Sequence, residues 1–127
     1  MTNLERKTIA TSNAPGAIGP YSQAVQFGNM IITSGQLGMN AAGEFPASVL
    51  EQAKQSLSNV KAILEEAGYG MEHVVKTTVF LKDMNDFQVV NEVYATFFAE
   101  PYPARSAVQV AKLPKDGLVE IEVIAVK

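Results

Sequence analysis

The sequence predicts an α+β fold in which a mixed β-sheet is covered on one face by two helices. Two stretches have the apolar spacing of helices, and short β-prone runs stand before, between and after them. Strands that alternate with helices favour crossover connections, which place parallel and antiparallel neighbours in one sheet. The 127 residues are enough for one hydrophobic core, so we expect a single domain over residues 1–127.

The first expected element is a β-hairpin. Residues 24–27 (Ala-Val-Gln-Phe) and 30–33 (Met-Ile-Ile-Thr) are β-prone, and Gly28-Asn29 between them is a typical two-residue turn. A loop containing two prolines and two glycines precedes the hairpin at residues 13–20. Glycines at 35, 38 and 43 then indicate irregular structure.

The first helix is marked at both ends. Ser48 with Glu51 three residues later forms a capping box, and Gly68 stands where a left-handed residue ends a helix. One apolar stripe with alternating spacings of three and four joins the two ends. Its members are Leu50, Ala53, Leu57, Val60, Leu64 and Ala67.

Three strands and a second helix complete the prediction. Residues 74–81 are β-prone, and Val75, Thr77, Val79 and Leu81 are expected on one face. Asp83 or Asn85 can cap the second helix, whose stripe is Phe87, Val90, Tyr94 and Phe97. The last two strands are expected at about 104–111 and 118–126. The second face of the sheet is also apolar in places, which indicates assembly through that face.

Composition excludes several kinds of chemistry. Cysteine is absent, so no disulfide, thiolate nucleophile or cysteine metal site exists, and the single histidine, His73, cannot form a histidine-rich metal site. We expect no metal and no cofactor. The net charge is −3 and the ten basic residues are spread along the chain, which argues against a nucleic-acid partner.

A cytoplasmic location is expected, because the sequence indicates neither a membrane-spanning helix nor a signal peptide. No apolar run approaches the roughly 18–20 residues of a membrane-spanning helix. The segment Met1-Thr-Asn-Leu-Glu-Arg-Lys7 contains an acid and has no apolar stretch behind its basic residues, so a cleaved signal peptide is not expected.

Arg105 is the first candidate functional residue. The chain has only two arginines, Arg6 and Arg105, and a guanidinium grips a carboxylate through two parallel hydrogen bonds. Glu120 and Glu122 share a face of the last strand, either as solvated side chains or with one of them as a buried acid or base. A simple hairpin would place Arg105 about 13 Å from Glu120. Either these strands are not partners, or a ligand bridges the gap, or the residues come from different subunits.

Four further residues are candidates, and two of them, Asn91 and Tyr21, have two interpretations each. Asn91 interrupts the apolar face of the second helix, and a structural hydrogen bond to a loop is favoured over ligand contact. Ser34-Gly35 follows a strand, where glycine permits close approach of a ligand to the backbone. Tyr21 lies in the Gly/Pro loop and either covers a site or packs.

Several motifs in order resemble the RidA/YjgF family of reactive intermediate deaminases, over residues 4–127. They are Ile18-Gly-Pro-Tyr-Ser-Gln-Ala24, Thr33-Ser-Gly-Gln36, Asn91 with Tyr94 and Phe97-Phe98, Pro103-Ala-Arg-Ser106, Leu113-Pro114 and Glu120-Ile-Glu122. The resemblance implies a chorismate-mutase-like fold with a mixed six-stranded sheet, into which the last strand inserts between earlier ones. It also implies a homotrimer, a central barrel built from the three sheets, and clefts between subunits.

The implied activity is that of a 2-iminobutanoate/2-iminopropanoate deaminase. Such an enzyme hydrolyses 2-iminoacids and their enamines (2-aminoacrylate, 2-aminocrotonate), released by pyridoxal-phosphate dehydratases, to 2-ketoacids and ammonia. By resemblance, Arg105 binds the substrate carboxylate and Glu120 activates water. Tyr21, Ser34 and Asn91 would line the cleft, and the backbone N–H groups of Gly35 and Ala107 would help to hold the carboxylate.

The sequence departs from the family pattern in two places. Position 107 is commonly cysteine in the family and is Ala107 here, and the loop between Phe98 and Pro103 is short.

Two alternative functions stand beside the deaminase. One is a non-catalytic 2-ketoacid-binding regulator of amino-acid metabolism, which would use the same Arg105 pocket. The other is a translation-inhibiting endoribonuclease, which the acidic net charge disfavours.

Overall fold

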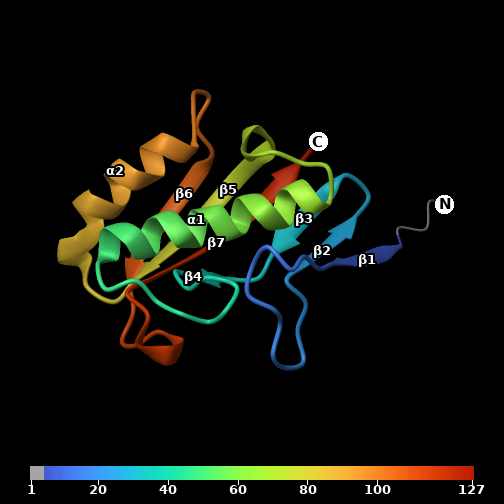
Figure 1. The fold of residues 1–127 in the computed structure, drawn as a ribbon. Helices are drawn as coiled ribbons and strands as arrows, with labels where there is room; N and C mark the ends of the chain where they lie inside the picture. Colours follow the sequence, from blue (N-terminus) through green and yellow to red (C-terminus); the bar gives the residue numbers. More distant parts are fainter. Residues whose placement is uncertain (1–4) are drawn as a thin grey trace.

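The computed structural model describes residues 5–127, and its centre is a mixed sheet with both helices on one face (Figure 1). Residues 1–4, which the domain prediction and the N-terminal argument include, lie outside the described residues. The strands are β1 (Arg6–Ile9), β2 (Ala24–Phe27), β3 (Met30–Thr33), β4 (Gln36–Leu37), β5 (Val74–Leu81), β6 (Ala104–Gln109) and β7 (Val119–Val126). The helices are α1 (Val49–Glu66) and α2 (Phe87–Phe97), and short 3₁₀ turns lie at Met71–His73, Met84–Asp86 and Pro114–Asp116.

The strand order is β1-β2-β3-β7-β5-β6, and β4 pairs with β7. Among residues 5–127, β5 and β6 are the only neighbouring strands that run parallel. Strand β7 lies between β3 and β5, as the family resemblance implied. The α+β prediction is confirmed, and the predicted hairpin over β2 and β3 is present. Because β5 separates β6 from β7, the strands of Arg105 and Glu120 are not hairpin partners.

The sheet has seven strands where the resemblance implied six. Strands β1 and β4 are not predicted by the residue pattern. Strand β1 is exposed at three of its four positions, so its sequence lacks the apolar alternation that marks a half-buried strand. Strand β4 is two residues long, too short for any periodic signal.

Helix α1 begins after Ser48 and ends before Gly68 as predicted, but of the two hydrogen bonds of the predicted capping box the structure of residues 5–127 has only one. The Ser48 side chain accepts a hydrogen bond from Glu51 N (3.1 Å), and Gly68 has φ +79°. The predicted stripe differs at one end, since Leu50 is exposed at the first turn. Polar side chains share the buried face instead: Ser56 Oγ donates to Gln36 O (2.7 Å), and Asn59 Nδ2 donates to Leu37 O (3.2 Å). These bonds fix β4 against the helix.

Strand β5 corrects one predicted face. Val75 was expected with Thr77, Val79 and Leu81, but it is 48% exposed. The register of β5 against β7 shifts between Val74 and Lys76, so Val74 takes the buried position. After β5, the carboxylate of Asp83 accepts from Asn85 N (2.9 Å) and caps the 3₁₀ turn Met84–Asp86. Neither Asp83 nor Asn85 caps α2, because its N-cap residue is Asp86, whose side chain forms no capping hydrogen bond.

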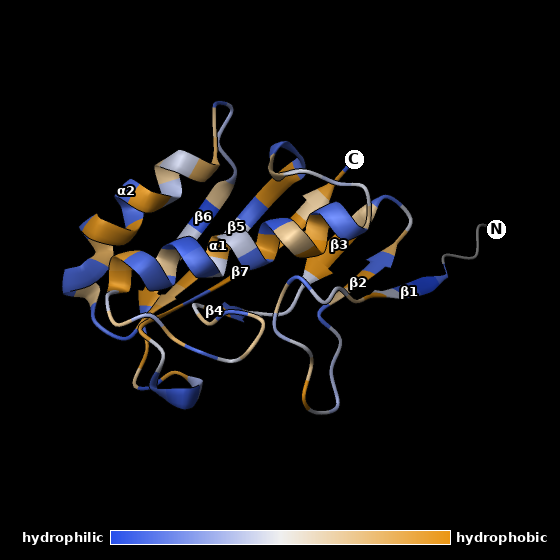
Figure 2. Cartoon of the chain, in the orientation of Figure 1, coloured by the Kyte–Doolittle hydropathy of each residue, from blue (hydrophilic) through white to orange (hydrophobic). Residues whose placement is uncertain are grey.

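The second face of the sheet carries no helix. Figure 2 shows hydrophobic stretches along β3, β5 and β7. The side chains at Val119, Ile121 and Val123 lie in the core beneath the helices, so the intervening residues of β7 point to the open face. Ile32 and Val108 are exposed on this face, 41% and 43% respectively. No helix of residues 5–127 has the length and apolar character needed to cross a membrane.

Candidate functional site

The side chain of Arg105 lies between β6 and helix α2. Its Nη1 donates to Asn91 Oδ1 at 2.6 Å, and its guanidinium carbon is 4.7 Å from the ring centre of Tyr94 and 5.3 Å from that of Phe87. Phe87, Asn91 and Tyr94 follow at spacings of four and three, so they share one face of the helix. Asn91 is predicted to bond to a loop, but its hydrogen-bond partner is Arg105 on strand β6.

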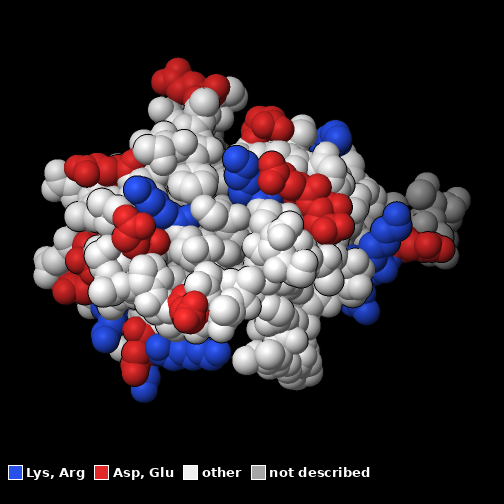
Figure 3. All heavy atoms as spheres, viewed as in Figure 1, with Lys and Arg blue, Asp and Glu red and all other residues white. Residues whose placement is uncertain are grey.

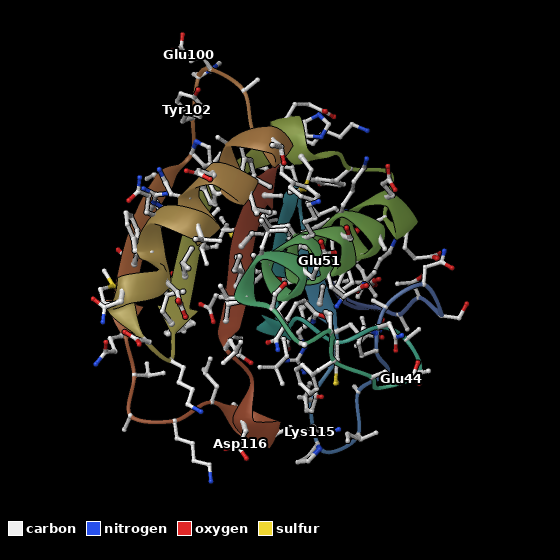
Figure 4. The ribbon with its side chains drawn as sticks, turned by 60° about the vertical axis from the view of Figure 1, so that its left-hand side comes forward. Glu44, Glu51, Glu100, Tyr102, Lys115 and Asp116 are labelled. Carbon is white, nitrogen blue, oxygen red and sulfur yellow. The ribbon has the colours of Figure 1, made fainter. Side chains whose placement is uncertain are left out.

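A cavity of about 410 Å³ opens beside this guanidinium. Asn91, Tyr94, Ala95, Tyr102, Pro103 and Arg105 line it. Figure 4 shows Tyr102 and Glu100 in the loop that joins α2 to β6. A guanidinium has five N–H donors, and Asn91 takes one of them. Within residues 5–127 no acidic side chain forms an ion pair with Arg105, so the planar fork is free for an incoming carboxylate.

Glu120 lies on the open face of the sheet, against Gly35. It is paired with Leu37 of β4 on one side and with Phe80 of β5 on the other. A Cβ atom at position 35 would come within 2.8 Å of Glu120 Cδ, so the absence of a side chain at Gly35 makes room for the carboxylate. Burial, and secondly the neighbouring carboxylate of Glu122, raises the pKa of Glu120 above its ordinary value.

The loop that carries Tyr21 is tied to the same region. Ser34 Oγ donates to Ser22 O (2.6 Å), and Ser34 N donates to Gln23 O (2.9 Å), which holds the loop against the β3–β4 connection. The hydroxyl of Ser34 is therefore engaged by the loop. Tyr21 itself is 52% exposed and is available to cover a ligand.

Sequence reasoning missed the buried amide of Gln23. Its Nε2 donates to Pro15 O (2.7 Å) and its Oε1 accepts from Thr11 N (2.7 Å), so this one side chain braces the Gly/Pro loop. The only signal in the sequence was a polar residue directly before a β-prone run. That pattern is common at strand ends and does not identify a buried side chain that hydrogen-bonds to a loop.

The predicted site residues form two groups on opposite faces of the sheet. Arg105 is opposite Thr77, and Glu120 is opposite Phe80, so they are two strands apart and three residues out of register. Standard strand spacings then separate their Cα atoms by roughly 14 Å. Asn91 and Ala107 belong to the group of Arg105, and Ser34 and Gly35 belong to the group of Glu120. One chain does not bring the guanidinium and the carboxylate together.

A family model described as Endoribonuclease L-PSP matches residues 11–127. A 2-iminobutanoate/2-iminopropanoate deaminase of Escherichia coli K12 is 62% identical over 125 residues, which are 95% of this chain and 98% of that protein. The crystal structure of E. coli TdcF with bound serine is 54% identical with a TM-score of 0.91, covering 95% of this chain and 98% of that one. The structure of RidA from an Antarctic Psychrobacter is 51% identical with a TM-score of 0.93, covering 95% and 99% respectively.

Proposed function

This chain belongs to the Endoribonuclease L-PSP family, and on that premise we propose that it is a deaminase of 2-iminoacids and their enamine tautomers. Its substrates would be imines such as those derived from 2-aminoacrylate and 2-aminocrotonate, and its products 2-ketoacids and ammonia. The deaminase name of relatives at 62% identity supports this activity. The observation that carries the proposal is the Arg105 guanidinium, held by neutral partners and open to a 410 Å³ cavity.

Two charged side chains share the proposed reaction: one binds the substrate, and the other activates water. Arg105 binds the substrate carboxylate through parallel hydrogen bonds, which fixes the position of the imine carbon. Glu120 accepts a proton from a water molecule as that water forms a bond to the carbon. From a protonated imine, this addition gives a neutral tetrahedral adduct and a protonated Glu120. Glu120 returns its proton to the nitrogen, and the C–N bond breaks as the hydroxyl proton of the adduct passes to the Glu120 carboxylate. The 2-ketoacid and ammonia leave, and ammonia takes the remaining proton to become ammonium. A carboxylate with a raised pKa suits this exchange, because it takes up and returns a proton closer to neutral pH.

The open edge of β6 supports a second contact to the carboxylate. Val110 N donates to Leu81 O, toward β5. Backbone N–H groups alternate in direction along a strand, so the N–H of Ala107, three residues earlier, points away from β5 to the free edge. This donor does not depend on the side chain, which fits the replacement of the family's usual cysteine by alanine.

We place the complete site between subunits of a trimer. Arg105 and Glu120 lie on opposite faces of the sheet of one chain, two strands apart. In the proposed trimer, a second copy would bring its Glu120 to the Arg105 of the first. The open apolar face, with Ile32 and Val108 exposed, supplies the surface for such assembly. The proposed compartment is the cytoplasm, where dehydratases release the imines.

The bound ligand of a relative supports the substrate class. The TdcF structure, 54% identical, contains serine, a small molecule with a carboxylate and an adjacent nitrogen. A 2-iminoacid offers the same two groups. For this chain we therefore propose a small amino-acid-derived ligand with its carboxylate at Arg105.

A 2-ketoacid-binding regulator is the second candidate function, because the Arg105 cavity alone can bind a ketoacid without Glu120. An endoribonuclease is a third candidate function, because the matching family model carries that description. Figure 3 shows basic and acidic side chains interspersed over the helix-covered face, without the clustered basic patch that a phosphate backbone requires.

The test is ammonia and ketoacid release when the purified chain is added to a serine or threonine dehydratase reaction. Sedimentation of the same sample should give about three times 13.7 kDa. Chains carrying Arg105→Ala and Glu120→Gln are then refolded together. If sites form between subunits, random mixing restores about a quarter of wild-type activity, because each mixed trimer regains one intact site. Inactive mixed trimers would contradict the intersubunit site, and an inactive wild type that still binds ketoacid would favour the regulator.

A further inference from the structure

A buried hydroxyl pair lies directly behind Arg105. The side-chain oxygens of Thr77 and Tyr94 are 2.8 Å apart, in the core between β5 and α2. Thr77 is fully buried and Tyr94 is 6% exposed. A buried phenol needs a hydrogen-bond partner, and Thr77 supplies it.

This pair connects the core to the guanidinium. Thr77 is the Cα partner of Arg105 in the parallel β5–β6 ladder, so both side chains point to the same face of the sheet. The ring of Tyr94 lies between them: its hydroxyl meets Thr77, and its face is 4.7 Å from the Arg105 guanidinium carbon. We infer that Tyr94 and Thr77 are positioning residues for Arg105, an inference that rests on the proposed carboxylate-binding role of that arginine.

The physical reason is the freedom of the arginine side chain. Arg105 is exposed on an edge strand, and without neighbours its long side chain would sample many rotamers. Asn91 fixes one nitrogen, and the Tyr94 ring fixes the plane of the guanidinium by stacking. The Thr77 bond sets the position of that ring. A guanidinium that is ordered before the ligand binds loses less conformational entropy on binding than a mobile one.

Two pairs of variants isolate this arrangement. Tyr94→Phe removes the hydroxyl and keeps the ring, and Thr77→Val removes the Thr77 hydroxyl at nearly constant shape. Thr77→Ser keeps the hydroxyl and should rescue. Tyr69→Phe is the matched control, because Tyr69 is 7% exposed, its hydroxyl donates to Asn29 O at 2.8 Å, and its ring also lies near a cation, Lys127 Nζ at 5.6 Å.

The first measurement needs no ligand. Nitrogen-15 relaxation of the Arg105 Nε–H reports how ordered the side chain is, and Tyr94→Phe and Thr77→Val should lower that order. Tyr69→Phe and Thr77→Ser should leave it unchanged. Equal Arg105 order in Tyr94→Phe and Tyr69→Phe would overturn the inference, whatever the activity of the protein.

The second measurement is binding and turnover. The Kd for 2-oxobutanoate and the KM for the imine should rise between about two- and tenfold in Tyr94→Phe, the range of one net hydrogen bond, while kcat changes less. In an Arg105→Lys background the same substitution should add nothing, because the planar fork is already lost. Full additivity in that background would overturn the inference. A wild type that binds 2-oxobutanoate but releases no ammonia would contradict only the proposed function.

Discussion

The surroundings of Arg105 and of Glu120 differ in almost every respect. Arg105 is exposed, stays charged, and contacts a neutral amide and two aromatic rings. Glu120 is half-buried, carries a raised pKa, lies near a second acid, and has no ion-pair partner among residues 5–127. One group is held by a neutral amide and two rings, whereas burial shifts the other toward its neutral form.

The difference matches two tasks in one reaction. A group that binds a constant negative charge works best when ordered and charged throughout, because its hydrogen bonds need a fixed geometry. A group that exchanges a proton with water works best when its pKa lies nearer the working pH. The chain places each kind of group on a separate face of the sheet, so only assembly combines them.

The largest expected effect is the loss of Arg105. Arg105→Ala should abolish imine hydrolysis and 2-ketoacid binding with the trimer intact, because no second guanidinium is available in the cavity. Arg105→Lys should rescue poorly, since an ammonium lacks the planar two-point grip. Coupled ammonia release, ketoacid calorimetry and sedimentation measure the three properties. Arg6→Ala is the control, and near wild-type turnover in Arg105→Ala would refute the carboxylate role.

The next effect concerns Glu120. Glu120→Gln should lower turnover by roughly 10²–10⁴, the usual contribution of general acid–base catalysis, while ketoacid binding changes much less. Glu122→Gln is the matched control, because Glu122 is exposed two residues further along the same face. Comparable loss in Glu122→Gln with Glu120→Gln unaffected would reverse the assignment of the two carboxylates.

A smaller effect is expected from Gly35→Ala. The new methyl group would lie 2.8 Å from Glu120 Cδ, so the flexible carboxylate must move. We expect turnover to fall by about tenfold, an effect of misplacing a catalytic group, and the ketoacid Kd to change less. Gly16→Ala, where no atom lies within 4 Å of the added carbon, should behave as wild type. Equal turnover in the two variants would show that the position of Glu120 is not critical.

The smallest effect is on stability. A raised pKa in the folded state means that the favourable contribution of protonated Glu120 is complete below its unfolded pKa, near 4.3, and is lost as pH rises through the folded pKa. Glu120→Gln, neutral at every pH, should therefore gain stability over wild type from about pH 4 to neutral pH. Urea unfolding at the two pH values measures this gain. A gain that is independent of pH would contradict the burial of the charge.

Much of the fold was predictable from local patterns. The N-cap residue Ser48, the left-handed Gly68 and the Gly28-Asn29 turn each give a strong signal in a few residues. The face of β5 was predicted wrongly at Val75 because a bulge changes the alternation, and a bulge leaves no mark on the apolar pattern. Strands β1 and β4 were missed because one is polar and the other very short.

The site was predictable as a set of residues but not as a geometry. Scarcity and motif singled out Arg105, and the family resemblance singled out Glu120. The distance between the two depends on β7 entering between β3 and β5, which residue patterns alone do not determine. Thr77 and Tyr94 appeared in the sequence only as members of apolar stripes, and their bond arises from packing between a strand and a helix.

The position of β7 also constrains how the protein folds during synthesis. Strands β1–β3 form one part of the sheet and β5–β6 another, and β7, made last, joins them. Until residues 119–126 leave the ribosome, β3 and β5 both have an unpaired apolar edge, which is the kind of edge that pairs with other chains. A single strand, β7, therefore covers two aggregation-prone edges at once, so a chain in which β7 has not yet docked exposes both.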